Sequence, residues 1–151
     1  MPALFRTVYV SKATPRCLDQ FTLNAVSIVA QSDRNNRTVG VTGALLAHKG
    51  WFLQALEGER AQVSRTLIRI GRDPRHEAID ILGFGPVEAR LFPQWFMGHL
   101  HLTPALGGLF AEIDRVLGHN PPDALDYATA EDLLARAARA HAASQPRTAA
   151  G

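Results

Sequence analysis

Hydrophobic and polar positions follow two different periods along the chain, and each change of period separates a strand from a helix. Residues 4–10, LFRTVYV, are rich in β-branched and aromatic types and predict a first strand. Thr14 and Pro15 then have the signature of a helix start, with Thr14 as the N-cap. The following pattern predicts one amphipathic helix, whose inward stripe consists of Leu18, Phe21, Ala25, Ile28, Ser32 and Asn36.

A hairpin follows in VGVTGALLAHKGWFLQALEG, where strands 41–48 and 51–57 flank a Lys-Gly turn. Within the second strand, the period of two places Gln54 on the same face as Phe52 and Leu56. A buried primary amide left without partners costs roughly 1 to 3 kcal/mol. We therefore expect a specific partner for the side chain of Gln54.

The remaining pattern completes a recognisable order of elements. Residues 59–72 carry an apolar stripe and predict a second helix, which ends near Asp73-Pro74. Residues 78–87 predict a fourth strand, and residues 96–102 predict a fifth. The order β-α-β-β-α-β is typical of the ferredoxin-like α+β fold, here with one strand added. We expect a mixed sheet with both helices on one face.

Helical patterns return after the fifth strand. Thr103-Pro104 starts an apolar stripe that Gly118 closes, and the segment HNPPD, residues 119–123, interrupts the pattern. Thr129 and Asp132 have capping-box spacing and predict the start of a last helix. The sequence thus predicts a C-terminal extension of two helices.

The chain divides into three predicted parts: a domain of residues 1–102, a helical extension of residues 103–143 and a disordered tail of residues 144–151. The extension has two interpretations. It is either a signal relay, packed on the sheet face opposite the two predicted helices or extended into a dimer contact, or a plain lid that covers this second face of the sheet.

Composition narrows the class of protein. The 151 residues, 46% hydrophobic and 20% charged, suit one globular core. No apolar run approaches the roughly 18 residues that span a bilayer, and the N-terminus lacks a signal-peptide pattern, so we expect a cytoplasmic protein with no membrane contact. The single Cys17 excludes an intramolecular disulfide. The net charge of +2 and the dispersed arginines do not favour nucleic-acid binding.

Polar side chains nevertheless fall on positions that the pattern assigns to the interior. Taken singly, each has an ordinary explanation. Tyr9 would be a core aromatic, and Asn35 and Asn36 would be helix C-caps. Arg69 and Asp73 would form a surface ion pair of small value. As a set they are harder to dismiss, because four separate elements supply Tyr9, Ser32, Asn36, Gln54, Arg69 and Asp73.

Five short blocks carry a resemblance. They are YVS at 9–11, NNR and GVTGALL within 35–46, FLQALEGE at 52–59, RDPRH at 72–76 and RLFPQWFMG at 90–98. In this order and at this compact spacing, they resemble the signature of the BLUF family, blue-light photoreceptors that bind a flavin. No single block is specific, but the five together are. The resemblance implies a flavin held between the two helices, against the sheet.

The resemblance also implies roles for single residues. Tyr9 matches the electron and proton donor to the photoexcited flavin, and Gln54 matches the amide that links this tyrosine to the ring. Trp95 and Met97 match the tryptophan and methionine whose placement responds to the switch. Which of these two faces the flavin in the dark, and whether Gln54 rotates or tautomerises, stay open. The other positions that match flavin contacts are Asn36, Asn35, Ser32, Arg69, Asp73, Arg75 and His76.

The resemblance finally implies a stand-alone bacterial photoreceptor without an enzymatic output domain. The expected cofactor is FAD, with FMN or riboflavin as alternatives, because all three share the ring. We expect a homo-oligomer that signals through a separate effector protein. A small ferredoxin-like binding module or an acylphosphatase-like hydrolase without flavin is the competing hypothesis. No metal is expected, because His99 and His101 have no carboxylate or cysteine nearby in the sequence.

Overall fold

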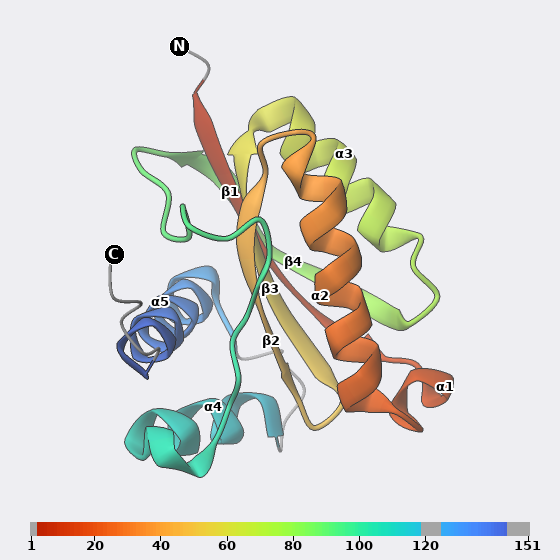
Figure 1. Ribbon diagram of the computed structural model, residues 1–151, viewed down its shortest axis with the longest axis vertical. Helices are drawn as coiled ribbons and strands as arrows, with labels where there is room; N and C mark the ends of the chain where they lie inside the picture. Colours follow the sequence, from red (N-terminus) through yellow and green to blue (C-terminus); the bar gives the residue numbers. More distant parts are fainter. Residues whose placement is uncertain (1–2, 119–124, 145–151) are drawn as a thin grey trace, which may run out of the picture.

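In the computed structural model, which describes residues 3–118 and 125–144, the described residues form a five-stranded mixed sheet in the order β4-β1-β3-β2-β5 (Figure 1). Neighbouring strands are antiparallel except for the parallel pair of β2 and β5. The strands are β1 (Leu4–Ala13), β2 (Thr42–His48), β3 (Trp51–Glu59), β4 (His76–Val87) and β5 (Gly98–His99).

Helices cover both faces of this sheet (Figure 1). Their bounds are α1 (Pro15–Leu18), α2 (Phe21–Arg37), α3 (Arg60–Gly71), the 3₁₀ turn η1 (Pro104–Leu106), α4 (Gly108–Gly118) and α5 (Tyr127–Ser144). Helices α2 and α3 lie on one face, and α4 and α5 lie on the other (Figure 1). The predicted ferredoxin-like α+β fold with a fifth strand and a two-helix C-terminal extension is confirmed.

The first helix is broken, whereas the sequence predicted one continuous helix. Thr14 caps α1 as expected, because its Oγ1 accepts from the amide of Cys17 at 3.4 Å. The Cys17 carbonyl then accepts from the amide of Gln20 at 3.3 Å and from Nδ2 of Asn24 at 3.1 Å. In a continuous helix, the Cys17 carbonyl would accept from the amide four residues further on, but these two bonds occupy it, and α1 ends at Leu18. The side chain of Leu18, predicted to point inward, is 47% exposed.

The fifth strand is much shorter than the predicted segment 96–102. Only Gly98 and His99 pair with β2 as a ladder. The carbonyl of Phe96 accepts from Nδ2 of Asn36 at 2.7 Å and is therefore bound to α2 rather than to a strand. The residues just before β5 form a loop, which isolated hydrogen bonds attach to the sheet. One of these bonds runs from the Gly43 amide to the Trp95 carbonyl at 3.1 Å.

The C-terminal helices also begin differently from the prediction. Gly107, at φ 61°, separates η1 from α4, so the stripe after Thr103 is not one helix. Asp126 caps α5, because its Oδ1 accepts from the amide of Thr129 at 2.8 Å. The predicted capping box of Thr129 and Asp132 is therefore wrong. The predicted breaker and nearly all of the predicted tail lie outside the described residues.

We expect Gly43→Ala to lower the free energy of unfolding by about 1 to 3 kcal/mol, the usual cost of overpacking. A Cβ at Gly43 in β2 would fall against the carbonyl oxygen of Ala55 in β3, and this backbone cannot move aside cheaply. Gly85→Ala in β4 is the control, because nothing lies within 4 Å of its Cβ position. Urea unfolding of both variants checks the expectation, and equal midpoints would contradict it.

Candidate functional site

A cavity of about 360 Å³ lies where α2 and the end of α3 meet β1 and β3. Its volume falls in the range of about 300 to 1,000 Å³ that small-molecule sites occupy. Apolar side chains of Ile28, Leu45 and Phe52 contribute to the wall. Most of the polar residues singled out in the sequence line it as well, namely Tyr9, Ser32, Asn35, Gln54, Arg69, Asp73, Arg75 and His76.

Tyr9 and Gln54 form a buried hydrogen-bonded pair. The two residues stand directly opposite each other on β1 and β3, and they are 2% and 1% exposed. The Tyr9 hydroxyl donates to Oε1 of Gln54. Nε2 of Gln54 donates to Sδ of Met97 at 3.2 Å. Both ends of the amide thus have partners, which answers the question that this glutamine raised in the sequence.

The protonation state of Tyr9 is fixed by its surroundings. Burial, followed by the negative charge of Asp73, raises the pKa of the Tyr9 hydroxyl far above its ordinary value. The hydroxyl therefore keeps its proton at neutral pH and acts as a donor. Because a hydroxyl donor requires an acceptor, the Gln54 amide is oriented with its carbonyl toward Tyr9.

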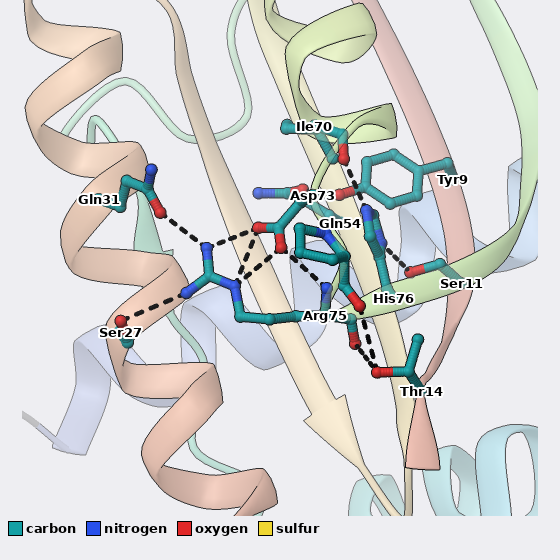
Figure 2. Close-up of polar contacts among 11 residues, drawn as sticks. Tyr9, Ser11, Thr14, Ser27, Gln31, Gln54, Ile70, Asp73, Arg75 and His76 are labelled. Atoms are coloured by element: carbon teal, nitrogen blue, oxygen red, sulfur yellow. Dashed lines mark hydrogen bonds and ion pairs between the residues drawn. The ribbon is translucent and has the colours of Figure 1, made fainter. Parts of the chain in front are cut away.

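Asp73 and Arg75 close a polar bridge across one side of the cavity, as Figure 2 shows. Nε of Arg75 lies 2.9 and 3.0 Å from the two carboxylate oxygens of Asp73. The guanidinium reaches α2, where it donates to Oε1 of Gln31 at 2.7 Å and to Oγ of Ser27 at 3.3 Å. Asp73 follows α3 and pairs with Arg75, so the ion pair with Arg69 that the sequence suggested is wrong.

Burial alone would raise the pKa of Asp73. The side-chain and backbone hydrogen bonds from Arg75, together with its charge and that of His76, outweigh burial and hold this pKa below its usual range. Asp73 is therefore a carboxylate at neutral pH, and it remains negative beside the Tyr9 hydroxyl.

His76 connects the floor of the cavity to the end of α3. Its Nε2 lies 2.7 Å from the carbonyl of Ile70, which can only accept, so this nitrogen carries a proton. Its Nδ1 lies 2.7 Å from Oγ of Ser11. Sequence reasoning gave Ser11 no role, although the period of two places it on the same face of β1 as Tyr9. It also missed Gln31, one helical turn before Asn35 on α2.

The two asparagines at the end of α2 have different positions. The helix continues through Arg37 and its C-cap is Thr38, so the interpretation of Asn35 and Asn36 as C-caps is wrong. Asn35 lines the cavity. Asn36 is buried, lies outside the group of lining residues, and holds the carbonyl of Phe96. Asn36 therefore ties α2 to the loop that precedes β5.

Met97 and Trp95 point to opposite sides of the sheet. Met97 is 4% exposed, belongs to the apolar cluster on the cavity face and contacts Gln54. Trp95 packs with the cluster that includes α5, and its ring meets that of His141 edge-on at 5.5 Å. Of the two arrangements left open by the sequence, the structure has Met97 on the cavity side.

Histidines gather near the end of β5. The rings of His99 and His101 lie 4.3 Å apart. Burial, followed by the charges of His101 and His141, lowers the pKa of His99 to about 4. Across residues 3–118 and 125–144, no group of three or more His, Cys, Asp or Glu side chains is placed to bind a metal ion. No helix in the same ranges has the length and apolarity needed to cross a bilayer.

Comparison with known proteins adds sequence and structural relatives. The family model for BLUF, sensors of blue-light using FAD, matches residues 4–98. The photoactivated adenylate cyclase subunit beta of Euglena longa is 30% identical over 119 residues. That match covers 74% of this chain but only 14% of the cyclase subunit, so the chain spans a small part of this curated relative.

Two solved structures share the fold. The dark-state structure of BlrB, a BLUF protein, is 29% identical with a TM-score of 0.71 and covers 92% of this chain and 98% of that one. The photo-activated state of BlsA is 23% identical with a TM-score of 0.75, and it covers 88% of this chain and 93% of that one. The second likeness concerns the fold alone.

Proposed function

The chain belongs to the BLUF family of blue-light sensors, and from this premise we propose that it is a flavin-binding photoreceptor whose switch is the Tyr9–Gln54 pair. The observation that carries the proposal is the buried chain of contacts from the Tyr9 hydroxyl through the Gln54 amide to Met97. Tyr9 and Gln54 line the wall of the cavity of about 360 Å³.

The residues around the cavity fit a flavin ring. Ile28, Leu45 and Phe52 offer apolar surface for the ring, while the amides of Asn35 and Gln54 offer donors and acceptors for its polar edge. The other contacts proposed for the cofactor are those of Asn36, Ser32, Arg69, Asp73 and His76. When bound, the flavin would supply blue-light absorption and an electron acceptor.

FAD is the proposed cofactor, in agreement with the description of the family. FMN and riboflavin remain alternatives, because the proposed contacts are with the ring, which all three flavins share. The arginines Arg69 and Arg72 line the same cavity and are suited to a phosphate-bearing tail. Loading the protein with each flavin in turn tests the choice, and tighter binding of FAD and FMN than of riboflavin would support a role for the arginines.

The chain's own residues supply the proposed switch. Tyr9 is a side chain that can lose an electron and a proton, and its hydroxyl already donates a hydrogen bond to Oε1 of Gln54. Rotation of the Gln54 amide would turn its NH₂ group toward Tyr9 and its carbonyl toward the sulfur of Met97. A thioether has no hydrogen to donate, so the contact that now joins Gln54 to Met97 would be lost. Tautomerisation would also change what the amide donates.

The signal is proposed to leave through the segment that contains Trp95 and Met97 and through the helices of residues 103–143. Residues 1–102 would then be the sensing domain. The receiver would be a separate effector protein, and the receptor would work as a cytoplasmic homo-oligomer without enzymatic activity of its own. The hydrolase alternative is less well supported, because Arg75 is already engaged by Asp73 and Gln31 rather than presented to a phosphate.

Filling the cavity tests the location of the flavin. We expect Ile28→Trp to weaken flavin binding by at least about tenfold, or 1.4 kcal/mol, because the indole would occupy the space of the ring. Leu23→Trp on the same helix is the control, because Leu23 is 65% exposed and lies outside the cavity. Fluorescence titration of FAD measures both variants. Equal affinities would place the flavin elsewhere.

A further inference from the structure

A second polar connection lies on the opposite face of β3 from Gln54. Glu57 is 0% exposed, three residues further along the strand. Its carboxylate accepts from the amide of Leu91 at 2.7 Å and from the amide of Phe92 at 2.8 Å. It also accepts from Nε of Arg6 at 2.9 Å. This buried carboxylate therefore holds the start of the loop that leads to Trp95 and Met97.

Arg6 on β1 extends the connection in two directions. Its Nη2 donates to the carbonyl of Ala89 at 2.9 Å, so Arg6 and Glu57 grip the same segment, residues 89–92. Its Nη1 donates to Oε2 of Glu131 on α5 at 2.7 Å. Glu57 and Arg6 are nearly inaccessible, whereas the Glu131 side chain is 31% exposed. One guanidinium thus joins the loop, the sheet and α5.

Helix α5 is attached to the same loop at a second point. His141, near its other end, meets the ring of Trp95 at 5.5 Å. A shift of the segment from Ala89 to Met97 would therefore reach α5 both through Arg6 and Glu131 and through Trp95. The apolar residues that dock α5 on the sheet, such as Leu133 and Leu134, would suffice for a lid. They do not explain a buried charge pair.

Buried ion pairs are weak sources of stability, since well-packed apolar residues of similar volume often do as well. Their hydrogen bonds are directional, however, and one partner left alone is costly. Such a pair therefore favours a few discrete arrangements over a continuous range. A set of contacts that transmits a displacement from one structural element to another requires this property. We call the contacts among Arg6, Glu57 and Glu131 the joint.

We propose that Arg6, Glu57 and Glu131 are positioning residues that transfer a displacement of the loop 89–97 to α5. This inference rests on the proposed function, because the displacement is the one that begins at Gln54 and Met97. The contact of Arg6 with Glu131 is the transmitting contact, and the contact of Arg6 with Glu57 holds the loop.

The test compares light and dark hydrogen exchange of the full flavin-loaded chain. In the unsubstituted protein, blue light changes amide exchange in residues 127–144. In Glu131→Ala this light-dependent change in α5 is lost, while the flavin red shift is retained. The control is Glu112→Ala, which removes the α4–α5 ion pair of Glu112 with Arg136 at 2.7 Å. The Glu112 and Glu131 side chains are 35% and 31% exposed, so the two variants are matched.

Each outcome decides the proposal. Loss of the light-dependent change in Glu131→Ala but not in Glu112→Ala supports the joint. Retention of the change in Glu131→Ala overturns it, and so does equal loss in both variants, which would indicate weakened docking of α5 alone. A red shift without any change in α5 of the unsubstituted protein overturns the joint and leaves the photoreceptor intact. Absence of the red shift overturns the photoreceptor itself. Glu131→Met, which keeps the length of the side chain but removes the acceptor, replaces Glu131→Ala if that variant does not fold.

Discussion

Replacing Gln54 by leucine is expected to abolish the light-induced red shift of the bound flavin while the flavin remains in the cavity. Leucine is apolar and of comparable size, and it has neither the oxygen that accepts from Tyr9 nor the NH₂ group that donates to Met97. Loss of one or two net hydrogen bonds, about 0.5 to 1.5 kcal/mol each, lowers flavin affinity only moderately. Absorption spectra before and after blue light, with the bound flavin quantified, measure both effects.

Gln31→Leu is the matched control for this variant. Gln31 lines the same cavity and has the same side chain, but its Oε1 is engaged by Arg75 rather than by Tyr9. We expect the red shift to persist in Gln31→Leu. A normal red shift in Gln54→Leu, or its loss in both variants, would refute the role assigned to Gln54.

Tyr9→Phe is expected to have an equally large effect, because it removes the proton donor of the pair without altering the ring. The variant leaves Oε1 of Gln54 buried without its donor, so we expect the free energy of unfolding to fall by about 1 to 3 kcal/mol. The bound flavin should no longer shift under blue light. Light-minus-dark absorption spectra and urea unfolding measure the two effects.

The chain has one other tyrosine, Tyr127, which begins α5. Tyr127→Phe removes the same hydroxyl from a residue that lies outside the cavity, so the red shift should survive. Persistence of the shift in Tyr9→Phe would show that the hydroxyl is not needed. Disappearance of the shift in Tyr127→Phe would show that the effect is not local to the cavity.

The parts of the site that could be predicted from sequence are those set by a local period. The alternation in FLQALEG placed Gln54 on an apolar face, and β1 then brought Tyr9 directly opposite it. The turn between β2 and β3 follows from Lys49-Gly50, where both residues have positive φ, 47° and 85°. These features depend on neighbours in the chain or on one strand pairing, and sequence patterns report both.

The parts that could not be predicted depend on partners far away in the sequence. Asp73 has three arginines within four residues, and only the structure shows that Arg75, which also reaches Gln31 on α2, is the one that pairs with it. The sequence did not show that Nδ2 of Asn36, proposed as a ring contact, donates to the carbonyl of Phe96, sixty residues away. The joint at Glu57 was likewise invisible, because no periodicity encodes the meeting of β1, β3 and the loop before β5.

The C-terminal helices show the same limit. Two arrangements were expected for them, packing on the sheet face opposite α2 and α3 or extension into a dimer contact, and they pack on that face (Figure 1). The pattern could not tell a lid from a relay, because both bury the same residues. The relay is favoured by the contact of Glu131 with Arg6 and by that of His141 with Trp95, because Arg6 and Trp95 are both connected to the loop that contains Met97.

The most direct test of the central claim is the absorption spectrum of the purified chain loaded with FAD, recorded in the dark, after blue light and again after a return to darkness. The account predicts a bound flavin whose spectrum shifts slightly to the red in the light and returns in the dark. A protein that takes up no flavin, or a bound flavin whose spectrum does not change, would contradict it.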